Sequence, residues 1–153
     1  MTKLLLSLHV LAAIIAVGPV TVAASMFPPA ARRVGLPDGA GDVGTVRLLH
    51  RICRVYAGLG VAVPVLGFAT AVAMGVLSDA WLIASIALTA AAAGLLVAFV
   101  LPRQEELLEQ LTERQPVARA RTARLAMLTG VFNLLWATVT VLMIVRPGST
   151  TGA

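Results

Sequence analysis

Two histidines are the residues best suited to chemistry in this chain, His9 in the apolar stretch LLSLHVLAAIIAVGPV and His50 in VRLLHRICRVY. An imidazole in an apolar helix serves as a haem or metal ligand, a proton relay or a hydrogen-bonding group. The two histidines begin consecutive apolar stretches. In antiparallel helices rising 1.5 Å per residue, they would therefore lie roughly 25 Å apart. A single haem held by both histidines of one chain is thus excluded.

Methionine is the other ligand type that apolar helices can offer to haem or copper. If both long connections lie on one side of a membrane, His9 shares the opposite side with Met74 and Met143. His9, Met74 and Met143 are therefore the candidate ligands for haem b or copper. Two other roles remain open for His9, a hydrogen bond to a neighbouring helix or water, and a part in a ligand or proton path.

Enzymatic motifs are absent from the sequence. The chain has no nucleophile elbow, no phosphate-binding glycine loop and no H-E-x-x-H motif. His50 and Cys53 share a helical face, but two ligands do not make a structural zinc site. Apart from His9, no ionisable group lies deep in an apolar stretch, as a proton-coupled exporter requires. We therefore expect a protein without catalytic activity.

The composition indicates that lipid surrounds most of the chain. Of its 153 residues, 59% are hydrophobic and only 12% are charged, with a mean hydropathy of +0.93. A soluble domain carries about 25% charged residues. The formal net charge is +5, but the basic residues lie beside apolar stretches, where they act as topology signals and contact anionic lipid. The predicted partner is therefore the bilayer, and not nucleic acid.

Four stretches are long enough to span a membrane, since about 20 apolar helical residues cross the hydrocarbon core. They cover residues of about 4–26, 56–77, 81–101 and 124–145. Only Ser78 and Asp79 separate the second from the third, which predicts a tight hairpin. The sequence thus predicts one all-α membrane domain over residues 1–153, a four-helix bundle of antiparallel up-down topology. The segment after Met26 is rich in Pro, Gly and Asp and is expected to be irregular, with Thr45 or Asp42 capping the next helix.

Arginine distribution predicts the orientation. Ten arginines flank or occupy the two long connections, at about residues 27–53 and 102–123, whereas only Lys3 and Arg146 lie on the other side. The positive-inside rule places both connections in the cytoplasm and both termini outside the bacterial inner membrane. Arg47, Arg51 and Arg54 share one helical face, which predicts an anchoring collar or a specific site for an anionic ligand.

Small residues predict where helices approach one another closely in lipid. The second and third stretches each carry one at every fourth position, Gly67, Ala71 and Gly75, and Ala90, Gly94 and Ala98. Asn133, near the middle of the fourth stretch, is expected to form an interhelical hydrogen bond. These seams could serve packing within one bundle, a homo-oligomer or a larger membrane complex.

The opening segment LHVLAAIIAVGP, followed by three further spans, resembles a family of small bacterial integral membrane proteins of unknown function. It also resembles, more loosely, the copper-resistance D and protoporphyrinogen-oxidase-like membrane families, whose first span begins Leu-His-Val and continues to Trp-x-Gly-Gly. Leu8-His9-Val10 and Gly18 match, whereas Ala16 and Pro19 replace the tryptophan and the second glycine. This second resemblance implies a haem or metal role for His9 alone.

The sequence therefore predicts a membrane protein without enzymatic activity, either a self-assembling bundle or an accessory subunit of a membrane complex. The alternative is a haem- or copper-handling protein that uses His9.

Overall fold

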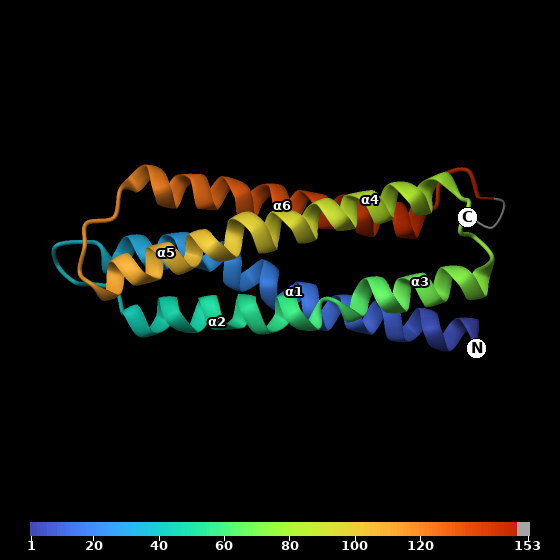
Figure 1. Cartoon of the computed structure of the whole chain (residues 1–153), viewed down its shortest axis with the longest axis horizontal. Coiled ribbons are helices and arrows are strands. Elements are labelled where there is room, and N and C mark those ends of the chain that lie inside the picture. The colour runs from blue at the N-terminus through green and yellow to red at the C-terminus, as the bar shows by residue number, and fades with distance from the viewer. Residues whose placement is uncertain (150–153) are drawn as a thin grey trace.

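The computed structural model describes residues 1–149, which are helical along almost their whole length. The elements are α1 (Thr2–Val34), α2 (Val43–Leu59), α3 (Ala62–Met74), α4 (Ala80–Leu95), the π-helical turn η1 (Leu96–Val100), α5 (Leu101–Thr112) and α6 (Arg119–Val145). They form four long passages, because α2 leads into α3, and α4 leads through η1 into α5 (Figure 1). The N-terminus and the C-terminal end of α6 lie at the same end of the bundle.

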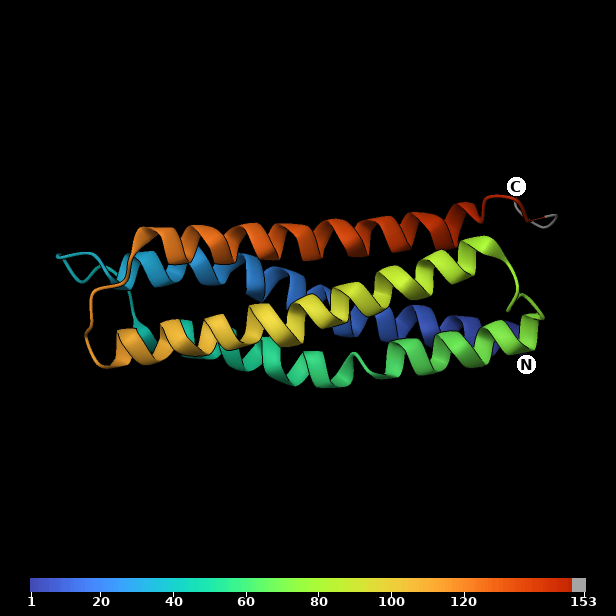
Figure 2. The same cartoon turned by 45° about the horizontal axis from the view of Figure 1, so that its top comes forward.

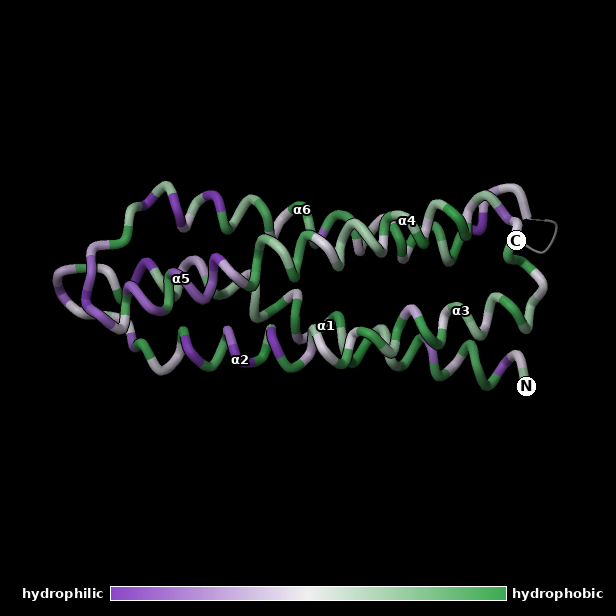
Figure 3. The backbone as a smooth tube through the Cα atoms, viewed as in Figure 1, coloured by the Kyte–Doolittle hydropathy of each residue, from purple (hydrophilic) through white to green (hydrophobic). Residues whose placement is uncertain are grey.

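Within residues 1–149, four helical passages are long and apolar enough to cross a membrane: Thr2–Val34, Val43–Met74, Ala80–Thr112 and Arg119–Val145. Only 17–28% of the most apolar part of each passage is buried inside the bundle. The remaining apolar surface would be costly to expose to water. Figure 3 shows hydrophobic residues along most of the bundle and hydrophilic ones gathered at the end with the two long connections. The predicted all-α fold with four membrane-spanning helices is confirmed.

Contacts between α1 and α6 show that these two helices run in opposite directions. Arg32, near the end of α1, hydrogen-bonds to Thr122, near the start of α6. Ser25, about two turns earlier on α1, accepts a hydrogen bond from Asn133, which lies three turns later on α6. Figure 2 shows the two helices alongside one another toward the end with the connections.

The helices extend beyond the apolar stretches, and the expectation of irregular chain directly after Met26 is wrong. Helix α1 continues through Pro28 and Pro29 to Val34. Phe27 and Ala31 are completely buried, so packing outweighs the helix-breaking tendency of the prolines. The irregular segment is only residues 35–42. It ends at Asp42, whose carboxylate accepts hydrogen bonds from the backbone N–H groups of Gly44 and Thr45, which confirms that Asp42 caps α2.

Two passages are interrupted, one between α2 and α3 and the other at η1, and a proline lies at each interruption. Pro64 has no N–H to donate to the Gly60 carbonyl, and that carbonyl instead accepts from Val63 at 3.1 Å, where α2 gives way to α3. Pro102 similarly leaves the Ala98 carbonyl without its usual donor, and the π-helical turn η1 lies directly before it.

The larger hydrophobic core lies toward the end with the connections. Its completely buried members include Phe27, Val46, Cys53, Val100 and Leu125, so all four passages contribute to it. A smaller cluster of Ala71, Trp81 and Leu82 lies around the tight hairpin. The hairpin itself begins at Gly75, whose φ of +68° ends α3 in the left-handed conformation that glycine favours.

Candidate functional site

His9 lies between α1 and α3 and binds the backbone of α3. Its Nδ1 is 2.9 Å from the carbonyl oxygen of Val63. A carbonyl oxygen only accepts, so Nδ1 carries the proton and Nε2 keeps its lone pair. The ring also lies over Gly67, where an added Cβ would be 2.8 Å from Cε1. Of the roles predicted for His9, the interhelical hydrogen bond is the one present in the structure.

The two candidate methionine ligands lie on other helices than His9, Met74 on α3 and Met143 on α6. Met74 ends α3 eleven residues after Val63, which is about 16 Å along the helix axis. Met143 is on α6, one turn before Arg146, whose guanidinium lies 5.6 Å from the centre of the Trp81 ring of α4. Among residues 1–149, no three His, Cys, Asp or Glu side chains gather to hold a metal ion. A shared haem or copper site of His9, Met74 and Met143 therefore stays a prediction.

The small residues of the two predicted seams lie in different surroundings. Gly67 faces His9, and Ala71 is buried beside Trp81 and Leu82. Gly75 serves the turn that ends α3 and has open space beside it. The seam on the third passage faces outward, and its three members are all exposed: Ala90, Gly94 and Ala98. Their role in contacts between helices therefore stays a prediction.

Asn133 makes a contact of the predicted kind. Its Nδ2 donates a 3.1 Å hydrogen bond to Oγ of Ser25 on α1, while its Oδ1 is buried without a hydrogen-bond partner. The amide is thus only half satisfied within the bundle. This contact ties α1 to α6, from the middle of the fourth apolar stretch to the end of the first.

A buried polar network joins α2 to α5. Gln104 is completely buried, and its Oε1 accepts a hydrogen bond of 3.1 Å from Nδ1 of His50. Its Nε2 points to Sγ of Cys53 at 3.6 Å. His50 and Cys53 thus share a helical face, as predicted, and both contact the side-chain amide of Gln104. Sequence reasoning missed Gln104, although its spacing from Leu107 and Leu111 places it on the apolar stripe of α5.

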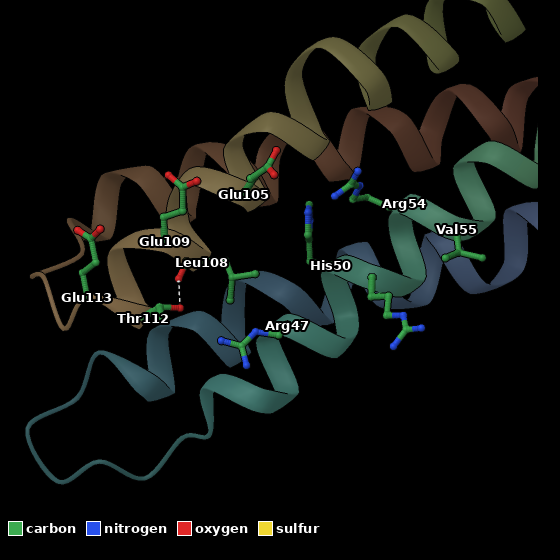
Figure 4. A pocket seen from close by; sticks show the side chains of 10 residues that line it. Arg47, His50, Arg54, Val55, Glu105, Leu108, Glu109, Thr112 and Glu113 are labelled. Carbon is green, nitrogen blue, oxygen red and sulfur yellow. Dashed lines mark hydrogen bonds between the residues drawn. The ribbon is translucent and has the colours of Figure 1, made fainter.

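An open groove of about 690 Å³ lies over this network, between α2 and α5. One wall carries arginines and the other carboxylates, and Figure 4 shows His50 projecting from α2 between them. The ten lining residues are Arg47, His50, Arg51, Arg54, Val55, Glu105, Leu108, Glu109, Thr112 and Glu113. The one hydrogen bond among these ten runs from Thr112 Oγ1 to the Leu108 carbonyl, so no arginine–glutamate hydrogen bond joins the two walls.

A second groove of about 520 Å³ lies on the other side of α5, facing the start of α6. Its charged lining residues are Arg103, Glu106, Arg121 and Arg124. The Arg103 guanidinium lies 5.5 Å from the centre of the Phe99 ring, which gives it a cation–π partner.

The comparisons with known proteins agree with this architecture. The model of a family described as "Predicted integral membrane protein (DUF2269)" matches residues 3–147. No curated protein and no solved structure matches the chain. The family description gives no activity, so the resemblance to the copper-resistance D and protoporphyrinogen-oxidase-like families stays an expectation. Because the match covers nearly the whole chain, this protein belongs to the DUF2269 family of integral membrane proteins.

Proposed function

We propose that this protein is a non-enzymatic bundle of the bacterial inner membrane that acts by association, either with itself or as an accessory subunit of a membrane complex. The observation that carries the proposal is that polar side chains between the helices bind other groups of the bundle. His9 binds the Val63 carbonyl, Asn133 binds Ser25, and His50 binds Gln104. These groups join helices of the bundle, as structural polar residues in membranes do.

The exposed seam of α4 supports association with another helix. Small side chains at Ala90, Gly94 and Ala98 let a second backbone approach closely, which is the main route to helix contact in lipid. In-membrane cross-linking and purification in mild detergent test this. We expect Gly94→Leu to abolish the oligomer or the co-purifying subunit. Gly130→Leu is the matched control, because Gly130 also has open space beside it but lies on α6. Equal assembly of both variants would contradict the proposal.

The proposed orientation has the connections at residues 35–42 and 113–118 in the cytoplasm and both termini outside. The support is the arginine excess at the end with the connections. Single cysteines placed at Ala40 and at Pro147, in a Cys53→Ser background, test it with a membrane-impermeant thiol reagent on intact cells. We expect labelling at position 147 alone. Labelling at position 40 alone would reverse the assigned orientation.

A haem- or copper-handling role for His9 is the second candidate, and one observation favours it. Ligating histidines characteristically donate their other ring N–H to a carbonyl or carboxylate, which fixes the tautomer. His9 does this through Val63 and leaves the Nε2 lone pair available. The visible absorption and copper content of the purified protein, with and without His9→Ala, decide the matter. A Soret band or bound copper that is present in the wild type and lost in His9→Ala would support this role. Wild-type protein that is colourless and free of copper would contradict it.

A further inference from the structure

We propose that the groove between α2 and α5 binds the phosphoethanolamine group of a membrane phospholipid, a phosphate joined to a primary ammonium. The cationic wall would hold the phosphate, while the carboxylates and His50 would hold the ammonium. The proposal rests on the chain being embedded in lipid and does not depend on whether it assembles with a partner.

The groove lies at the depth of lipid head groups. Arg54 comes two residues before the apolar stretch that begins at Tyr56, and Glu105 comes four residues after Leu101, where the third apolar stretch ends. Both walls belong to the hydrophilic end of the bundle seen in Figure 3. A phospholipid in the adjoining leaflet therefore presents its head group at the level of the groove.

The charges of the two walls match a zwitterion. Arg47, Arg51 and Arg54 supply guanidinium groups, which suit phosphate oxygens. Glu105 and Glu109 line the groove from α5, and their carboxylates suit an ammonium. Since no arginine–glutamate hydrogen bond joins the walls, both sets of groups are available to a ligand.

His50 indicates which kind of cation the groove would take. The side chain is only 6% exposed, and its Nε2 is fully buried without a hydrogen-bond partner. Because Nδ1 donates to Gln104 Oε1, Nε2 is the acceptor of a neutral imidazole. A buried acceptor gains from a donor. A primary ammonium has N–H groups to donate, whereas the quaternary ammonium of choline has none. The ten lining residues also include no Trp, Tyr or Phe ring to bind choline.

Apolar residues continue from the groove along the outer face of the second passage. Val55 lines the groove and is 51% exposed, and Leu59, one turn further into the apolar region, is 53% exposed. An acyl chain attached to the bound head group would lie along these side chains. This continuity favours a lipid over a soluble phosphoethanolamine compound.

Competition among lipids with identical acyl chains tests the head-group preference. The purified chain is incubated with an equimolar mixture of phosphatidylethanolamine, phosphatidylcholine and phosphatidylglycerol in detergent, and retained lipid is counted by native mass spectrometry. We expect phosphatidylethanolamine to be retained at least about tenfold over either of the others, since only it satisfies both walls and His50. Equal retention of phosphatidylcholine would overturn the proposal.

Surface variants assign the binding to this groove. Glu105→Gln with Glu109→Gln should reduce phosphatidylethanolamine to the level of phosphatidylcholine, and Arg47→Gln with Arg54→Gln should reduce retention of all three lipids. These four side chains are exposed, so the fold should persist, which circular dichroism checks. Glu106→Gln with Arg121→Gln, in the groove on the other side of α5, is the control. Unchanged preference in the folded Glu105/Glu109 variant would refute the assignment.

A soluble competitor distinguishes a membrane phospholipid from a soluble phosphoethanolamine compound as the ligand. Glycerophosphoethanolamine carries the same phosphate and ammonium without acyl chains. Failure of millimolar amounts to displace phosphatidylethanolamine supports the lipid. Displacement at concentrations equal to those of the lipid would show that the groove recognises the head group alone, and would overturn the role assigned to Val55 and Leu59.

Discussion

His9 and Val63 are joined by a hydrogen bond of 2.9 Å between Nδ1 and the main-chain oxygen, and this bond ties α1 to α3. Gly67, one turn further along α3, makes room for the imidazole, because a Cβ at that position would lie 2.8 Å from Cε1. On α1 the main core cluster begins only at Val20. The histidine and the glycine therefore hold together a part of the bundle that the large core does not reach.

Substitution of Gly67 should loosen this contact. In Gly67→Val the imidazole must leave its position and lose the Val63 carbonyl, and we expect a loss of about 1–3 kcal/mol in the free energy of unfolding. Unfolding in detergent micelles, followed by circular dichroism, measures it. Gly130→Val is the control, because open space surrounds that position on α6.

A second substitution tests whether the loss comes from displacement of the His9 imidazole. In a His9→Ala background the ring is gone, and Gly67→Val should then be close to neutral. An equally large loss in both backgrounds would show that the effect of the valine does not come from the imidazole.

The four spans could be predicted from the sequence, because hydropathy marks the part of each helix that lies in lipid. This part is the same whether or not the helix continues beyond it. The helix ends themselves were not predictable from composition. The segment with Pro28 and Pro29 is helical because Phe27 and Ala31 are buried against residues distant in the sequence. Such tertiary packing is not visible in a local window. Asp42 was predictable as a cap because its hydrogen bonds are local.

The candidate sites were predictable only in part, for the same reason. Residue types and spacing identified His9, but its acceptor is a backbone carbonyl 54 residues away. Gln104 could have been singled out as a polar residue on the apolar stripe of α5. Its pairing with His50, however, depends on how α2 meets α5 in the folded bundle.

Gln104→Leu should destabilise the bundle more than its small change in volume implies. The substitution leaves the buried N–H of His50 without an acceptor, and an unsatisfied buried donor costs about 1–3 kcal/mol. The double variant Gln104→Leu with His50→Leu removes both polar partners and should recover most of that loss. Guanidinium or urea titration of the wild type and the two variants in micelles gives the comparison. A double variant that is less stable than Gln104→Leu would contradict this account.

The hydrogen bond between Ser25 and Asn133 predicts that substitution of Ser25 lowers the stability of the bundle more than substitution of Asn133. Ser25→Ala leaves Nδ2 of Asn133 without a partner beside an Oδ1 that already has none, and we expect a loss of about 1 kcal/mol. Asn133→Leu removes both unsatisfied groups and should change stability by less than that. Thermal unfolding of the two single variants in one detergent checks the order, and the reverse order would show that Oδ1 has a partner in the membrane.

Asp42 should make α2 sensitive to acid. The backbone N–H groups of Gly44 and Thr45 hold the pKa of its carboxyl below the ordinary value of 3.8. The charged form is therefore favoured by folding, and its contribution is fully present above the ordinary pKa and disappears as pH falls through the lowered one. We expect Asp42→Ala to unfold at a lower temperature than the wild type at pH 7, with the difference shrinking as the pH falls below the ordinary pKa of 3.8. Asp38→Ala, in the same connection, should show little difference over the same pH range. A constant gap between wild type and Asp42→Ala from pH 7 to pH 2 would mean that the carboxylate charge does not contribute to the cap.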